Sequence, residues 1–216
     1  FDFTVENLVD GAFYNAGQSC CAVERIYVMR PLFQRFVDAY VAEVEKYVIG
    51  DPEDERTTLG PLAQRKAVEF MEFQVQDALA KGARVLTGGK RMPGPGYYFE
   101  PTVLVDVNHS MSVMMEESFG PVIGIMPVDS EEEAICLMND SPYGLTASIW
   151  TQDPERGERL GHRVATGTLY VNRCDYLDPE LAWVGIKDSG HGCTLSHLGY
   201  LYLTRPKSFH IRTQTA

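Results

Sequence analysis

Short apolar runs typical of buried strands alternate along this chain with longer segments whose apolar residues recur every three or four positions. Strands that alternate with helices at this spacing form βαβ units, which build a mostly parallel sheet. The sequence therefore predicts an α/β fold with helices on both faces of that sheet. The predicted helices cover residues 31–48, 62–79, 130–140 and 153–165, and the predicted strands cover 83–89, 97–107, 121–128, 145–151 and 167–172.

Four local signals mark where the predicted helices begin or end. Pro31 suits the first turn of a helix, and Lys81-Gly82 is a typical helix end. Acidic residues fill the first turn of the 130–140 helix, and Asp153-Pro154 opens the next helix. These signals agree with the apolar periodicity.

The last fourteen residues have a different pattern from the rest of the chain. After about Tyr202 the chain continues as "LTRPKSFHIR", an alternating pattern typical of a strand with no following element to pair with. We expect one domain over residues 1–202 and a C-terminal strand over 203–216 that pairs with another subunit as an oligomerisation arm. The expected partner is another copy of the chain.

Composition excludes several classes of function. A formal net charge of −11 and a pI near 4.9 argue against nucleic acid as a partner, because phosphate binding needs clustered Lys and Arg. No apolar run is long enough to span a membrane, and no signal peptide opens the chain. Five scattered cysteines do not form a disulfide framework, so we expect a cytoplasmic or mitochondrial location rather than secretion.

The stretch "NAGQSCC" places two adjacent cysteines after a Gly-Gln bend. A thiol is nucleophilic near neutral pH when its surroundings favour the thiolate, and a sharp bend can aim it at a cleft. The alternative is that Cys20 and Cys21 are small buried apolar residues.

The surrounding motifs favour the interpretation of this stretch as a nucleophile. An aromatic residue followed by Asn-x-Gly-Gln-x-Cys stands here over residues 13–20. Further blocks follow in order: "EESFGPV" at 116–122, "NDSPYGLTASIWT" at 139–151, "GTLYVN" at 167–172 and "GIKDSGHG" at 185–192. Together they resemble the aldehyde dehydrogenase superfamily over nearly the whole chain. The resemblance implies that residues 1–202 are the catalytic domain of that family.

The resemblance also implies roles for single residues. Cys20 would attack the aldehyde through a thiohemiacetal and a thioester, and its own backbone N–H would form half of the oxyanion hole. Glu117 would hold the nicotinamide ribose of NAD or NADP, and Phe119 would pack beside the nicotinamide. Residues expected to line the pocket for a small-molecule aldehyde are Phe13, Ser19, Cys21, Cys174, Tyr176, Leu177 and Trp183.

Some parts of the family pattern are missing. The glutamate that activates water in the family, the asparagine of the oxyanion hole and the nucleotide-binding fold have no match in this chain. Val184 replaces the first glycine of a Gly-Gly pair, and Gly192-Cys193-Thr194 replaces Gly-Arg-Glu. We therefore expect the chain to be the catalytic half of a longer protein, inactive or only weakly esterolytic by itself.

Other interpretations remain open. A thiol protease needs an aromatic residue soon after the nucleophile, but Cys21-Ala22 follows here. A metal site built from His191, Cys193 and His197 matches no common zinc spacing, so no metal is expected. The chain could also be a non-catalytic structural or interaction module with the same fold. Arg173, beside the expected pocket, could favour a semialdehyde that carries a carboxylate, or be an ordinary surface residue.

Overall fold

We describe the fold from a computed structural model that describes residues 1–214. Four strands form the main sheet in the order β1-β4-β3-β2. Both β1 and β3 run parallel to the central strand β4, whereas β2 pairs antiparallel with β3 at the edge. The predicted mostly parallel sheet is confirmed, with β2 as its exception. The strands are β1 (Arg25–Met29), β2 (Arg84–Thr87), β3 (Thr102–Val105) and β4 (Val122–Val128).

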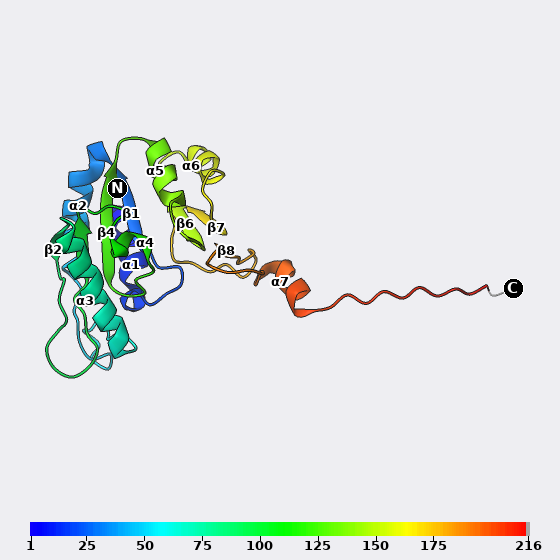
Figure 1. The fold of residues 1–216 in the computed structure, drawn as a ribbon, viewed down its shortest axis with the longest axis horizontal. Helices are drawn as coiled ribbons and strands as arrows, with labels where there is room; N and C mark the ends of the chain where they lie inside the picture. The colour runs from blue at the N-terminus through cyan, green and yellow to red at the C-terminus, as the bar shows by residue number, and fades with distance from the viewer. Residues whose placement is uncertain (215–216) are drawn as a thin grey trace.

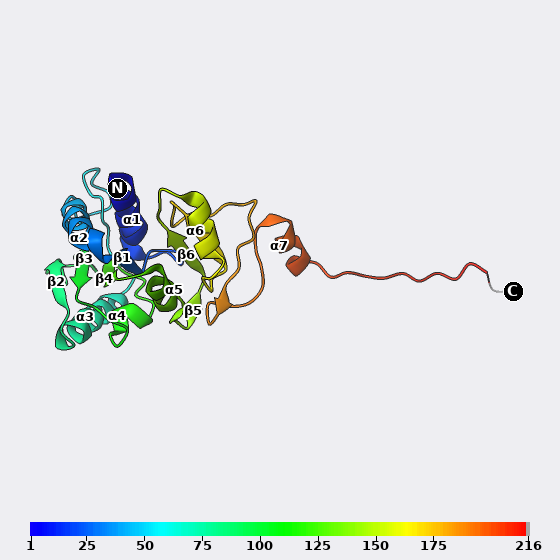
Figure 2. The same cartoon turned by 90° about the horizontal axis from the view of Figure 1, so that it is seen from above.

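Helices cover both faces of this sheet, as predicted. Figure 2 shows α1 and α2 on one face and α3 and α4 on the other. The helices are α1 (Asp2–Phe13), α2 (Arg30–Val44), α3 (Arg65–Ala80) and α4 (Ser112–Met115). The sheet is therefore shielded from water on both sides, which parallel sheets require.

The main core lies between these layers. The central strand β4 is almost completely buried, and so is β3. Between α1 and α2, the rings of Phe13 and Tyr40 lie 6.4 Å apart, and neither side chain is exposed. Each fully buried apolar side chain of this size contributes about 1.5–3 kcal/mol to folding.

A second, smaller part follows β4. Figure 1 shows α5 leading from the main sheet to α6 and two small sheets, one of β6 and β7 and one of β5 and β8. The pair β6·β7 is parallel and β5·β8 is antiparallel. The elements are α5 (Glu131–Asn139), β5 (Tyr143–Gly144), β6 (Thr146–Ile149), α6 (Pro154–Gly161), β7 (Thr168–Val171) and β8 (Ile186–Lys187).

Two of the predicted helix starts are confirmed, and the structure shows a side-chain cap at each of them. The Ser130 hydroxyl accepts the Glu133 N–H at the start of α5, and the Asp153 carboxylate accepts the Arg156 N–H before Pro154. Elsewhere the boundaries differ. The helix predicted from residue 62 begins at Arg65, because the Leu62 N–H donates to the Tyr97 carbonyl 2.8 Å away. The helix predicted to reach residue 48 ends at Val44, since turns follow.

The C-terminal region forms a helix followed by extended chain. Helix α7 (Ser196–Leu203) comes before residues 204–214, which have no regular secondary structure and project from the body in Figure 1. The strand predicted over 203–216 is therefore not formed within the described residues, and 215–216 lie outside them. Because a strand needs a partner strand, its role as an oligomerisation arm stays a prediction. Up to residue 214, no helix is long and apolar enough to span a membrane.

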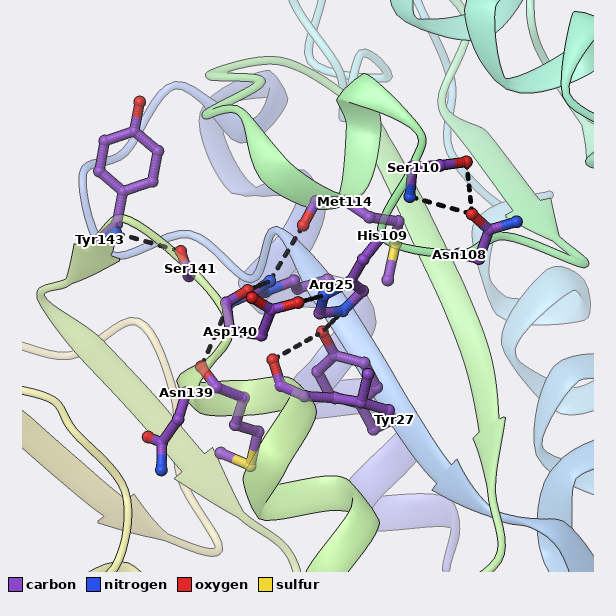
Figure 3. A network of polar contacts seen from close by, with 12 residues as sticks. Arg25, Tyr27, Asn108, His109, Ser110, Met114, Asn139, Asp140, Ser141 and Tyr143 are labelled. Carbon is purple, nitrogen blue, oxygen red and sulfur yellow. Dashed lines mark hydrogen bonds and ion pairs between the residues drawn. The ribbon is translucent and has the colours of Figure 1, made fainter.

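A polar network joins the two parts of the molecule, and Figure 3 shows it at close range. The Arg25 guanidinium donates to the carbonyls of Met114, Met138 and Asp140 at 3.0, 3.3 and 3.3 Å. Beside it, the His109 ring bridges the Tyr27 hydroxyl and the Asp140 carboxylate, at 2.7 Å each. A cation at the ends of two helices satisfies carbonyls that no helical N–H reaches.

We predict that Arg25→Met lowers the free energy of unfolding by about 2–4 kcal/mol, because partly buried carbonyls lose a charged donor. Chemical denaturation followed by far-UV circular dichroism measures this. Arg84→Met is the matched control, since Arg84 pairs with Asp106 on the surface and should contribute about 0–1 kcal/mol. Equal losses in the two variants would contradict the assignment.

Candidate active site

Two loops that are distant in sequence meet at the end of the main sheet where β1 and β4 begin. One loop leads from α1 to β1 and contains Cys20, and the other leads from α4 to β4 and contains Glu117. Because β1 and β4 are parallel neighbours, both strands begin at the same end of the sheet. The parallel pairing therefore brings the predicted nucleophile loop beside the predicted cofactor loop.

The nucleophile loop opens with a run of left-handed residues. Asn15, Ala16 and Gly17 have φ values of 50°, 56° and 72°. At Gly17 an added Cβ would lie 2.4 Å from the Gly120 carbonyl oxygen, so only glycine fits this crossing of the two loops. Non-glycine residues in this region carry about 1–3 kcal/mol of strain each and often occur at functional sites.

Side-chain amides hold this turn in place. Asn15 Nδ2 donates to the Gln18 carbonyl at 3.1 Å, and Gln18 Nε2 donates to the Asn15 carbonyl at 3.0 Å. Gln18 Oε1 also accepts the Ala63 N–H at 2.8 Å, which ties the loop to the segment before α3. The Asn and Gln of the motif thus fix the backbone that carries Cys20.

A β-turn places the two cysteines in opposite environments. The Ala22 N–H donates to the Ser19 carbonyl at 3.1 Å, so Cys20 and Cys21 are the two central residues of the turn. Cys20 is exposed, whereas Cys21 is buried with 5% of its surface accessible. Cys20 is therefore the thiol that a molecule in solution can reach.

Asp175 stabilises this turn through its two side-chain hydrogen bonds. Its Oδ1 accepts the Ser19 hydroxyl at 2.8 Å and the Cys21 thiol at 2.7 Å. Burial, and then the bond to Asp175, raise the pKa of Cys21 to about 12, which keeps this thiol protonated at neutral pH. No sequence signal marked Asp175, because it lies far along the chain from the cysteines.

Cys20 itself is free of hydrogen bonds. Across residues 1–214, neither its thiol nor its backbone N–H has a hydrogen-bond partner. Three acidic residues lie near Cys20 in the sequence: Glu24 accepts two backbone N–H groups, and Glu6 and Asp10 form no hydrogen bond to Cys20. The Cys20 N–H is thus available to an oxyanion. No carboxylate within residues 1–214 is hydrogen-bonded to the Cys20 thiol as its base.

Glu24 supports the predicted cofactor loop. Its two carboxylate oxygens accept the N–H groups of Ser118, at 2.9 Å, and Phe119, at 3.1 Å. Burial raises the pKa of Glu24 above its usual range, while these two bonds oppose that rise. Glu117 and the Phe119 ring, which is 40% accessible, both face solvent. Since an exposed carboxylate and an exposed ring suit a ribose and a nicotinamide, the two residues fit the predicted cofactor.

Three of the predicted pocket residues have different surroundings from those expected. Phe13 is fully buried between α1 and α2, and Cys21 is buried behind the turn, so neither side chain faces a ligand in this structure. Cys174 packs against α1, where its thiol donates to the Asn7 carbonyl at 3.3 Å. The aromatic side chain that is exposed beside the turn is Tyr14 rather than Phe13, because the left-handed turn begins directly after it.

Of the remaining pocket candidates, Ser19 lies in the cysteine turn, where its hydroxyl donates to Asp175, and the others lie in the segments after β7. Tyr176 and Leu177 are exposed, and the Arg173 guanidinium lies 3.3 Å from the centre of the Tyr176 ring. The Tyr170 hydroxyl donates to the Tyr176 carbonyl, which fixes this loop. Trp183 is partly buried and pairs through its backbone with Thr194.

The His191, Cys193 and His197 alternative finds no support in the described part of the chain. Among residues 1–214, no group of three or more His, Cys, Asp or Glu side chains is arranged to hold a metal ion. The Cys193 thiol instead lies 3.5 Å from the Thr194 carbonyl.

The sequence matches the model of the aldehyde dehydrogenase family over residues 1–209. A succinate-semialdehyde dehydrogenase [NADP(+)] of Deinococcus radiodurans is 39% identical over 206 residues, which cover 95% of this chain and 43% of that protein. A succinate semialdehyde dehydrogenase [NAD(P)+] of Escherichia coli K12 is 37% identical over 92% of this chain and 43% of its own length. The chain thus spans less than half of these curated relatives.

Solved structures have the same fold. Lactaldehyde dehydrogenase from Escherichia coli superposes with a TM-score of 0.87 at 38% identity, over 90% of this chain and 41% of the other. Betaine aldehyde dehydrogenase from Staphylococcus aureus in complex with NAD+ superposes with a TM-score of 0.87 at 33% identity, over 92% and 40%.

We predict that iodoacetamide at pH 8 modifies Cys20 and Cys136, which are both exposed, and leaves Cys21 and Cys174 unmodified. Burial raises the pKa of Cys21 and of Cys174 to about 12, so their thiolate fraction at pH 8 is only ~10⁻⁴. Peptide mass spectrometry after short reaction times measures the order of labelling. Modification of Cys21 as fast as Cys136 would show that the turn does not bury it.

Proposed function

Because this chain belongs to the aldehyde dehydrogenase family, we propose that the intact protein oxidises an aldehyde to a carboxylic acid with NAD or NADP. The observation that carries the proposal is the position of Cys20. It is an exposed thiol at the corner of a braced turn, and it has no hydrogen-bond partner among residues 1–214. The neighbouring loop carries an exposed carboxylate and an exposed aromatic ring.

The proposed chemistry begins at the Cys20 sulfur. As a thiolate it adds to the carbonyl carbon of the aldehyde, and the C=O bond becomes a C–O⁻ bond that the Cys20 N–H can stabilise. NAD or NADP, when bound, supplies the acceptor for the hydride that leaves this carbon. Water then releases the carboxylic acid from the resulting thioester and restores the thiol.

The chain's own residues account for only part of this sequence. Glu117 and Phe119 are proposed to hold the ribose and nicotinamide ends of the cofactor, from the loop before β4. Within residues 1–214 no carboxylate forms a hydrogen bond with Cys20. We therefore assign the activation of water to the portion of the relatives' length that this chain does not span.

The proposed substrate is an aldehyde that also carries a carboxylate. Arg173 lies on the loop that Asp175 ties to the cysteine turn, and its guanidinium is exposed over the Tyr176 ring. No acidic side chain of the described residues forms an ion pair with it. An unpaired guanidinium next to the turn suits a substrate carboxylate. The names of the two succinate-semialdehyde dehydrogenases support the same class.

We predict that the intact protein oxidises small aldehydes with NAD or NADP, and that Cys20→Ala lowers kcat at least about 10³-fold, because the nucleophile is lost. Production of NADH or NADPH is followed at 340 nm. Cys136→Ala, an exposed cysteine on α5, is the control and should retain activity. A folded intact protein without turnover on any aldehyde would favour the structural or interaction module instead.

We further predict that Arg173→Gln raises KM for succinic semialdehyde about tenfold and leaves KM for butanal within twofold, since one charged hydrogen bond is worth about 1.5–3 kcal/mol. Arg156→Gln removes a surface pair with Glu131 and is the matched control. The same change of KM for both aldehydes would contradict the proposed recognition of a carboxylate.

A further inference from the structure

Glu24 connects the two loops of the site through hydrogen bonds. It follows Cys20 by four residues and directly precedes β1. Its Oε2 accepts the Ser118 N–H at 2.9 Å and its Oε1 accepts the Phe119 N–H at 3.1 Å. One carboxylate from the nucleophile loop therefore binds two successive N–H groups of the predicted cofactor loop.

These N–H groups belong to an unusual piece of backbone. Phe119 has a φ of 49°, a left-handed conformation that is unfavourable for a residue with a bulky side chain. Successive N–H groups in such a turn form a concave site for an anion. The Glu24 carboxylate is the anion that the structure places there, and it stabilises the conformation that turns the Phe119 ring toward solvent.

The nucleophile loop is anchored next to Glu24, and the cofactor loop is buried at Ser118. The Val23 N–H donates to the Gly11 carbonyl at 2.9 Å, which fixes the residue before Glu24 to α1. Ser118 is buried, with 4% of its surface accessible, so its N–H has little access to water as an alternative acceptor. Loss of the Glu24 acceptor would leave the buried Ser118 N–H without a partner, which costs about 1–3 kcal/mol.

We propose that Glu24 is a positioning residue for cofactor binding, which fixes the left-handed turn at Phe119 and thereby the directions of Glu117 and the Phe119 ring. The inference rests on the proposed function of that loop. Glu24 is not a general base in this scheme, because both of its oxygens are occupied by backbone N–H groups.

The decisive variant is Glu24→Gln, which keeps the shape of the side chain but sets an NH₂ group against one backbone N–H. Glu24→Asp keeps the charge but is one methylene too short to reach both donors. Glu69→Gln removes one negative charge from an exposed position on α3 and is the matched control. The first measurement is amide hydrogen exchange in the peptide that contains Ser118 and Phe119, without cofactor. We expect exchange there to be at least tenfold faster in Glu24→Gln than in the wild type and in Glu69→Gln.

The second measurement separates positioning from general damage, in the intact protein. In Glu24→Gln the dissociation constant and KM for NAD or NADP should rise about tenfold. KM for the aldehyde and the rate at which iodoacetamide modifies Cys20 should stay within twofold. Glu24→Asp should show the same split and serves in place of Glu24→Gln if that variant does not fold.

Two results would overturn the inference. One is wild-type cofactor affinity in Glu24→Gln, and the other is a parallel loss of Cys20 modification, which would indicate general disruption. If the wild-type protein binds neither NAD nor NADP, the proposed function and this inference fail together. Faster exchange at Ser118 and Phe119 in the variant would then identify Glu24 as a brace of the turn without a role in cofactor binding.

Discussion

The parallel hydrogen-bonded pairing of β1 with β4 is the constraint on which the site depends. In this ladder Arg25 lies opposite Gly124 and Met29 lies opposite Val128, without a bulge. The register fixes where β1 and β4 begin relative to each other. It therefore fixes which residues of the two preceding loops face each other. The Gly17–Gly120 crossing and the Glu24 bonds are both consequences of that register.

Carboxylates stabilise the cysteine turn, the cofactor loop and the junction between the two parts of the chain. Asp175 binds two donors on either side of Cys20, Glu24 binds the cofactor loop, and Asp140 holds His109 where the two parts of the chain meet. In a chain with a net charge of −11, each of these acids is matched by nearby donors. The thiol is thereby left free in the middle of a rigid frame, which suits a nucleophile whose partners are substrate atoms.

Much of the fold could be predicted from local patterns, because helices and buried strands repeat their apolar residues with different periods. The acidic first turn of the 130–140 helix and the Asp153-Pro154 pair gave correct helix starts, since such signals act on their own neighbours. The two-residue strands β5 and β8 could not be found, because they are too short to have a period. Cys20 could be identified by the resemblance of its motif, whereas Asp175 could not, since only the folded chain brings it to the turn. Phe13 was assigned to the pocket because the sequence does not show that the end of α1 directs its side chain into the core.

The short connection between Cys20 and β1 also has an evolutionary consequence. The segment from Cys20 to Glu24 is anchored at both ends, because Cys20 belongs to the turn and Glu24 directly precedes β1. A single inserted residue would therefore move one of them relative to the other by up to about 3.5 Å. Natural variation in this connection is therefore expected to proceed by replacement and not by a change of length. The exposed, glycine-containing loop at 90–98 has no such double anchorage to the site and can accept insertions.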